Sequence, residues 1–284
     1  MKAPAFDYVR AASLPQVFEL LRQHGDDARV LAGGQTLIAT LNMRLSEPRL
    51  LIDIGGLAAL RGITLAGPLL HIGALTTHAE IEASALVARH APLLAQAAPH
   101  IAHRAIRNRG TLGGSLAFAD PAAEWPACVL ALEATLVLAS PRGERRVPAL
   151  SFFTGLYTTA LASDELLVAC EVPVLAAGER QAFDELARRH GDYAITGLAA
   201  RAVLQGGRLQ GLRLAFLGLE DRPVRAPRTE AALQGRAVDD STLALAAATL
   251  AAELKPGGDL TNGPETKRHL AGVLAQRVLR RLAA

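Results

Sequence analysis

Short apolar runs, separated by glycine, proline and polar residues, recur along the chain. Runs of this length bounded by turn residues are typical of strands. They predict strands at residues 6–9, 29–32, 50–54, 69–74 and 166–173. A further apolar run at 127–138 predicts a short helix followed by a strand, and residues 144–147 predict the strand that returns from a turn at 141–143.

Longer amphipathic segments, some with recognisable start signals, predict helices. Ser13 followed by Gln16, and Thr77 followed by Glu80, have the spacing of a capping box, in which two helix-start groups bond each other. The predicted helices cover residues 14–24, 36–45, 91–103, 241–254 and 264–282.

The order of these elements favours an α+β fold of two domains. Short strands alternate with short helices, but without the regular period of about 30 residues that βαβ units require. Residues 176–178 form the best boundary, which predicts one domain at 1–175 and a smaller one at 179–284. In the second domain, Gly206 and Gly207 stand between two apolar runs as a hairpin turn. We therefore expect a three-stranded sheet there, packed by the two C-terminal helices.

Composition excludes several classes of function. The hydrophobic fraction of 50% and the charged fraction of 20% are ordinary for globular domains, and the net charge of +3 is dispersed. No basic run is interleaved with stacking aromatics, so we expect no nucleic-acid partner. No apolar run approaches the roughly 18 residues of a membrane span, and no signal peptide is visible, so we expect a cytoplasmic protein.

The cysteine count limits the redox chemistry of this chain. Cys128 and Cys170 are far apart in apolar contexts, where buried thiols are the usual outcome. An iron–sulfur cluster normally needs about four cysteines. Any such cluster would therefore belong to another chain.

Two glycine pairs carry the candidate chemistry. Gly33-Gly34 follows a predicted strand and precedes a predicted helix, and Gly113-Gly114 stands between Thr111 and Ser115. Glycine pairs offer backbone N–H groups that no Cβ hinders, so an anion can approach closely. Neither loop matches the Rossmann or Walker pattern. Two such loops in one chain predict a diphosphate held from two sides, as in a flavin dinucleotide.

The longer motifs make the prediction specific. AGGQT at 32–36 and TLGGSLAFADPAAEWPA at 111–127 resemble the two flavin-binding motifs of the FAD-carrying medium subunit of molybdenum hydroxylases. That family includes bacterial carbon monoxide dehydrogenase and the central segment of xanthine dehydrogenase. The opening FDYVRAASLPQVFELL, RNRGTLGG and the later RRHGDYAI fit as well, so the resemblance covers nearly the whole chain.

The resemblance implies a fold and a set of cofactor contacts. It implies FAD bound noncovalently in a vanillyl-alcohol-oxidase-type domain of two α+β subdomains, with a smaller C-terminal domain beside them. Transferred position by position, the cofactor-binding residues are Ala32, Gly33, Gly34, Gln35, Thr36, Thr111, Leu112, Gly113, Gly114, Ser115, Asp120, Glu124 and Tyr193. As alternatives, Asp120 and Glu124 are charges at a helix start, and Tyr193 is a core or edge aromatic.

Other candidate residues allow two readings each. Arg104, Arg107 and Arg109 either steady the diphosphate or form a docking surface for a partner. His100 and His103, three apart on a predicted helix, are either a ligand pair or part of a solvated or interface face. We expect no metal ligands and no general acid or base in this chain, because the redox chemistry of a flavoprotein belongs to the flavin.

The resulting hypothesis is a flavoprotein electron-transfer subunit. The resemblance implies a large partner subunit with a molybdenum cofactor and a small one with iron–sulfur clusters, in a heterotrimer or a dimer of heterotrimers. FAD in this chain would pass electrons to NAD, a quinone or oxygen. The alternatives are a self-contained FAD-dependent oxidoreductase acting on its own small substrate, and a flavin-free interaction protein that retains the fold.

Overall fold

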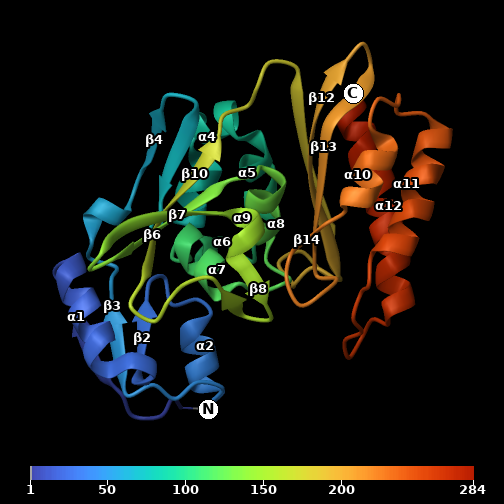
Figure 1. Cartoon of the computed structure of the whole chain (residues 1–284). Coiled ribbons are helices and arrows are strands. Elements are labelled where there is room, and N and C mark those ends of the chain that lie inside the picture. The colour runs from blue at the N-terminus through green and yellow to red at the C-terminus, as the bar shows by residue number, and fades with distance from the viewer. Residues whose placement is uncertain (1) are drawn as a thin grey trace.

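The computed structural model describes residues 2–284 and begins with a small parallel sheet (Figure 1). Its strands β1 (Asp7–Arg10) and β2 (Ala28–Leu31) both pair in parallel with the central β3 (Leu50–Asp53). Helices α1 (Leu14–His24) and α2 (Leu37–Asn42) complete this subdomain. Because the strands are parallel, their carboxyl ends lie along the same edge of the sheet.

A five-stranded antiparallel sheet forms the middle of the molecule. Its order is β4 (Ile63–Ala66), β5 (Leu69–Gly73), β10 (Leu166–Pro173), β6 (Thr135–Ser140) and β7 (Gly143–Pro148). One face, with Leu136 and Leu138, shares a core with helices that include α5 (Pro92–Ala97) and α8 (Glu124–Ala131). The other face, with Val137 and Val168, packs against the first subdomain. The sheet thus holds helices on one side and the parallel subdomain on the other.

The helices on that face are short and joined by tight turns. They are α3 (His78–Ala83), α4 (Ala85–His90), α5 (Pro92–Ala97), η3 (Ala98–His100), α6 (Arg104–Arg107), α7 (Leu112–Phe118) and α8 (Glu124–Ala131). After β7, α9 (Ala149–Phe152) leads into a hairpin of β8 (Phe153–Gly155) and β9 (Thr158–Thr159). Two further 3-10 turns are η1 (Gly25–Asp27) and η2 (Ala58–Leu60).

The C-terminal domain is an antiparallel sheet with helices on its outer face (Figure 1). Its strands are β11 (Glu179–Leu186), β12 (Thr196–Gln205), β13 (Arg208–Leu217) and β14 (Val224–Arg225), in that order. Its helices are α10 (Pro227–Leu233), α11 (Asp240–Glu253) and α12 (Pro264–Ala283). The sheet has one strand more than the three predicted, because β14 is a two-residue edge strand too short to leave a sequence pattern.

Most predicted elements are present, and one helix is wrong. The sequence pattern predicted a continuous helix over 91–103, whereas α5 ends at Ala97 and a 3-10 turn follows. Pro99 explains the break, because its ring removes a backbone donor and clashes with the preceding turn of a helix. The capping box at Thr77 is complete, with Thr77 and Glu80 bonding each other. The strands, the C-terminal helices and the Gly206-Gly207 hairpin lie where they were predicted.

Both cysteines are buried and free, as predicted. Burial raises the pKa of Cys170 to about 12 and the pKa of Cys128 well above its ordinary value. Within residues 2–284, no helix is both long and apolar enough to cross a bilayer.

Glu133 joins the first domain to the C-terminal sheet. It follows α8 in a left-handed conformation, with a φ of 53°. Its carboxylate accepts from Arg213 Nε at 2.7 Å and from Arg201, and lies 3.6 Å from Arg225 Nη1. Partial burial acts against ionisation, but the bond from Arg213 and the charges of the three arginines lower the pKa of Glu133. Three strands of one domain therefore converge on one carboxylate of the other.

We expect Glu133→Gln to lower the free energy of unfolding at pH 7 by about 1 to 2 kcal/mol, because charge-assisted bonds to a partly exposed group are lost. Since the folded-state pKa of Glu133 is lowered, its contribution is present above the ordinary value of 4.5 and is lost as the pH falls through the folded-state pKa. Urea denaturation at neutral and acidic pH measures both effects. Glu144→Gln, on the exposed strand β7, is the control, and equal losses in the two variants would contradict this role.

Candidate functional site

A cavity of about 850 Å³ opens at the carboxyl edge of the parallel sheet. Arg10 ends β1, Asp53 ends β3, and the loop of Gly33 and Gly34 follows β2. All of these residues line the cavity, together with Arg109 from the second glycine motif. The carboxyl edge of parallel strands is the usual ligand crevice of such sheets.

The two glycine loops pack directly on each other. A Cβ at Gly33 would lie 2.1 Å from the carbonyl oxygen of Arg109, and one at Gly114 would lie 3.8 Å from the Cβ of Ala32. A distance of 2.1 Å is impossible for a real side chain, so Gly33 is required for backbone-to-backbone contact. The contact places the first predicted motif against the second.

The first loop presents free backbone donors to the cavity. The N–H groups of residues 33 to 37 donate to no backbone or side-chain acceptor within residues 2–284. Thr36 precedes α2 without capping it through its side chain. Gly34 has a φ of 72°, in the left-handed region that glycine favours, and residues 32–35 line the cavity. Unpaired amides of this kind bind anionic oxygens.

The amides of the second loop are already used, which corrects the expectation that both glycine pairs offer free donors. Gly113 N donates to Ala74 O at 2.8 Å, and Gly114 N donates to the Thr111 hydroxyl at 3.1 Å. Leu112 N and Ser115 N are bonded as well. Thr111 caps α7, and a Cβ at Gly113 would lie 2.4 Å from that of Ala74. The second pair is therefore required by packing.

The charge of the cavity is positive. Arg10, Arg61 and Arg109 line it against one acid, Asp53. Asp53 is held by the Tyr8 hydroxyl and by Gly55 N at 2.7 Å, and Arg61 Nη1 lies 3.6 Å from Glu80. Arginine fits phosphate geometry well, so the free amides and the arginines favour the same kind of ligand.

The three arginines of the central stretch have different roles. Arg109 lines the cavity. Arg107 is buried and bonds Glu82 and the carbonyl of Ile101, so it holds the fold. Arg104 is exposed and contacts Asn108.

His100 and His103 do not form a ligand pair. His100 Nδ1 lies 3.4 Å from Glu185 Oε1, while the ring of His103 lies against Gly191. The break in the predicted helix at Pro99 separates them.

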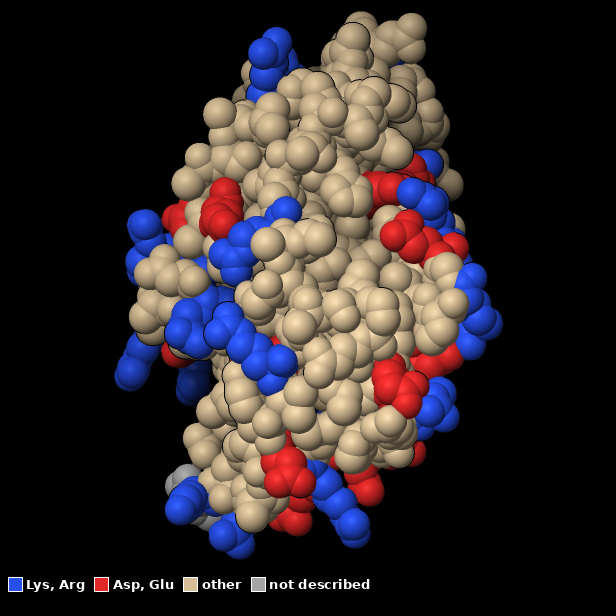
Figure 2. All heavy atoms as spheres, turned by 90° about the vertical axis from the view of Figure 1, so that its left-hand side faces the viewer, with Lys and Arg blue, Asp and Glu red and all other residues tan. Residues whose placement is uncertain are grey.

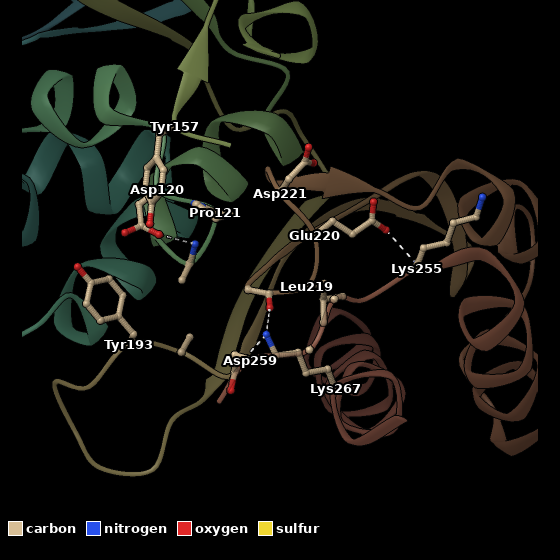
Figure 3. Close-up of a pocket in the computed structure, with 15 residues that line it drawn as sticks. Asp120, Pro121, Tyr157, Tyr193, Leu219, Glu220, Asp221, Lys255, Asp259 and Lys267 are labelled. Carbon is tan, nitrogen blue, oxygen red and sulfur yellow. Dashed lines mark hydrogen bonds and ion pairs between the residues drawn. The ribbon is translucent and has the colours of Figure 1, made fainter. Parts of the chain in front are cut away.

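A second cavity, of about 720 Å³, lies at the other end of α7 (Figure 3). Thr111 precedes this helix and lines the first cavity, while Asp120 follows it and lines the second. Tyr157 and Tyr193 lie beside Asp120, and burial raises the pKa of Asp120. Tyr193 is 69% exposed, so it is not a core aromatic.

Glu124 is the first residue of α8, as the helix-start alternative proposed. Burial, and after it the charges of Glu185 and Asp120, raise the pKa of Glu124 to about 8. Glu185 is itself 5% exposed in its side chain and has one unpartnered carboxylate oxygen. Glu124 is therefore largely protonated at pH 7. It does not carry the full negative charge that the helix-start alternative implies.

The predicted site residues divide between the two cavities. Ala32, Gly33, Gly34, Gln35 and Thr111 line the first, and Asp120 and Tyr193 line the second. The others support these walls: Thr36 precedes α2, Leu112 and Gly113 are buried, Gly114 and Ser115 are half-buried on α7, and Glu124 begins α8.

Sequence reasoning missed Arg10, Asp53, Arg61 and Tyr157. Arg10 directly follows the strand predicted at 6–9 and Asp53 lies near the end of the one predicted at 50–54; their place at a ligand crevice depends on the parallel pairing of these strands, which the sequence did not predict. Tyr157 has a φ of 52° and packs on Phe118, with ring centroids 5.1 Å apart. No sequence signal points to it.

The fold and the first cavity define an α+β protein with a positively charged crevice suited to an anionic ligand. The chain belongs to the family of FAD-binding medium subunits of molybdenum hydroxylases: residues 4–175 match the FAD binding domain in molybdopterin dehydrogenase. Residues 181–282 match the CO dehydrogenase flavoprotein C-terminal domain. The resemblance seen in the motifs is thus confirmed, as is the α+β class, and the chain is an FAD-binding subunit of a dehydrogenase.

Relatives match over nearly the full length. The chain is 39% identical to the 6-hydroxypseudooxynicotine dehydrogenase complex subunit alpha of Paenarthrobacter nicotinovorans, over 98% of this chain and 95% of that protein. Carbon monoxide dehydrogenase from Hydrogenophaga pseudoflava superposes with a TM-score of 0.97 at 38% identity, over 99% and 98% of the two chains. Quinoline 2-oxidoreductase from Pseudomonas putida 86 gives 0.95 at 41%, over 100% and 98%.

We expect Gly33→Ala to abolish flavin retention and to destabilise the protein, because its Cβ would overlap the Arg109 carbonyl. Overpacking of this kind costs about 1 to 3 kcal/mol or more. Absorbance of the purified protein and thermal unfolding measure the two effects. Gly263→Ala, where a Cβ meets nothing within 4 Å and φ is −74°, is the matched control. Normal flavin content in Gly33→Ala would show that the contact is dispensable.

Glu124 also makes the stability of the flavin-free protein depend on pH. Because its folded-state pKa of about 8 exceeds the ordinary 4.5, the folded state binds a proton that the unfolded state lacks, and stability falls as the pH rises between these values. We expect Glu124→Gln to be more stable than the unchanged protein near pH 9 by at least about 1 kcal/mol, and equally stable near pH 4. Denaturation at both pH values tests this, and a difference independent of pH would contradict it.

Proposed function

We propose that this chain takes electrons from the iron–sulfur clusters of a partner subunit onto FAD and passes them to an external acceptor. The observation that carries the proposal is the pair of cavities at the two ends of α7. One has the free amides and arginines that suit a diphosphate, and the other has two exposed tyrosines that suit a flat ring. The seven residues of α7 span about 10 Å, a length that a ribityl chain can bridge.

In this binding mode, the loop of Ala32 to Thr36 would hold the diphosphate through its backbone, and Arg109 would add positive charge. Asp120 and Tyr193, which line the second cavity, would face the ribityl and ring portions, and Glu124 begins the helix four residues after Asp120. When bound, FAD supplies the capacity to accept electrons singly and to release them in pairs. The chain would contribute orientation and electrostatics: with its pKa raised to about 8, Glu124 at the start of α8 would add little negative charge near an electron-rich ring.

We propose that the partners are a small iron–sulfur subunit and a large molybdenum subunit, in a heterotrimer or a dimer of heterotrimers. The names of the relatives support this, since they describe subunits of complexes, and the carbon monoxide dehydrogenase from Hydrogenophaga pseudoflava is described with reference to a molybdenum cofactor. The two cysteines of this chain are buried apart from each other, in α8 and β10. The substrate of the complex would then be oxidised on another chain.

We expect affinity purification of this chain from its native host to bring down two further polypeptides, with FAD, molybdenum and iron. The visible spectrum and metal analysis of the purified material measure this, and a Gly33→Ala bait is the control for flavin. A yellow protein that purifies alone, without metals, and turns over a small substrate would overturn the proposal in favour of a self-contained flavoenzyme.

A further inference from the structure

Glu185 is a carboxylate on an apolar surface. It lies on β11 two residues after Phe183, so its side chain points to the same face of the sheet, the face that packs on α5 and α8 of the first domain. Its cross-strand partner is Gly197, and a Cβ at Gly197 would lie 3.0 Å from the Cβ of Glu185. Glycine therefore leaves room for a carboxylate inside the interface between the two domains.

The partners of this buried carboxylate are few. Its Oε1 lies 3.4 Å from His100 Nδ1, and its Oε2 has no hydrogen-bond partner among residues 2–284. No lysine or arginine nitrogen of the described residues lies within 4 Å of it. A buried acid is costly unless it is neutral or fully paired. The place of Glu185 in the apolar interface therefore calls for a reason other than stability.

A second acid faces Glu185 from helix α8. Glu124 and Cys128 stand four residues apart on this helix, so they share one of its faces. Burial is the main cause that raises the pKa of each, and the negative charge of Glu185 raises both further. Glu185 therefore lies toward the face of α8 that carries Glu124. Two buried acids whose charges act on each other titrate as a pair, and one proton is held between them.

The other charges that act on Glu124 are acidic as well. Asp120, four residues before it, raises the pKa of Glu124, and no basic group acts against this shift. The charged residues that line the second cavity are the acids Asp120, Glu220, Asp221 and Asp259 and the bases Lys255 and Lys267 (Figure 3). Lys267 is already paired with Asp259, at 2.9 Å. The surroundings on this side therefore favour a proton on Glu124.

His100 connects these acids to solvent. It ends the 3-10 turn η3, and 37% of its side chain is exposed. Its ring stands edge-on to that of Phe183, with centroids 5.3 Å apart, which holds the ring beside β11. A histidine ring can take up a proton on one nitrogen and release another from the second. Nδ1 faces Glu185, so Nε2 is the nitrogen left for water.

We propose that His100 and Glu185 carry protons between solvent and Glu124, near the second cavity. The use of this path rests on the proposed function, because full reduction of FAD takes up two protons with two electrons and reoxidation returns them. On the way in, His100 takes a proton from water at Nε2 and gives the proton of Nδ1 to Glu185 Oε1. Glu185 then passes a proton to Glu124 from its other oxygen, after Glu124 has given up its own toward the cavity. The way out reverses each transfer, so every group returns to its starting state.

The coupling of the two acids is measured on the flavin-free chain by urea denaturation at pH 9. We expect Glu124→Gln to raise the folding equilibrium constant, and this gain should be at least about 5-fold smaller when Glu185 is already Gln, because the charge that opposes an ionised Glu124 is gone. Glu165→Gln is the matched control. It removes an acid with the same 5% side-chain exposure whose charge does not act on Glu124, and it should leave the gain unchanged.

The role of His100 is measured on the assembled complex, reduced with dithionite and freed of excess reductant under anaerobic conditions. Two ferricyanide ions take up the two electrons of fully reduced, neutral FAD, and its two protons go to solvent, where a pH-indicator dye in weak buffer follows them. His100→Gln should slow the release of protons at least about 10-fold, and added imidazole should restore it. His90→Gln, which changes another partly exposed histidine, should release protons at the unchanged rate.

The outcomes separate this path from the proposed function. An equal gain from Glu124→Gln with and without Glu185 would show that the acids share no proton, whatever the flavin content of the complex. Unchanged proton release in His100→Gln, or a loss that imidazole does not restore, would show that protons travel by another route. A complex without flavin absorbance would refute the proposed function, while coupled acids in the flavin-free chain would still support the pair.

Discussion

The contact between the backbone of Gly33 and the carbonyl of Arg109 is the constraint on which the rest of the site depends. It joins the end of a parallel strand to a loop from the helical layer, two segments that lie about 75 residues apart. The N–H groups of the second loop donate to Ala74 O and to the Thr111 hydroxyl. The N–H groups of the loop after β2 have no such acceptors. One motif supplies the donors, and the other supplies the surface against which they are held.

Helix α7 then orders the two cavities by charge. Its start lies beside arginines and free amides, and the residue after its end, Asp120, lies in an acidic, aromatic pocket. The two ends of this short helix therefore lie in cavities of opposite charge. On the face drawn in Figure 2, basic side chains gather along one flank beside a broad neutral area, and acidic side chains are scattered.

Much of this could be predicted from the sequence, for physical reasons that also explain the failures. Glycine pairs beside hydroxyl residues indicate close backbone approach wherever they occur, and the long second motif identified the family. The state of each amide could not be predicted, because it depends on Ala74 and Thr76, whose contact with the second loop is tertiary. Arg61 and Tyr157 reach the cavities only through folding. The broken helix is different, because Pro99 was visible and its effect follows from elementary stereochemistry.

The burial of both thiols has a practical consequence. Cys128 and Cys170 are at most 1% exposed, and burial raises the pKa of each thiol, so neither presents a reactive thiolate to reagents in solution. We therefore expect the folded native chain not to react with maleimides or iodoacetamides. A single cysteine placed at Leu260, on the exposed tip of the loop that holds Asp259, would be the sole reactive site. A fluorophore attached there would report events at the acidic cavity without any other change to the molecule.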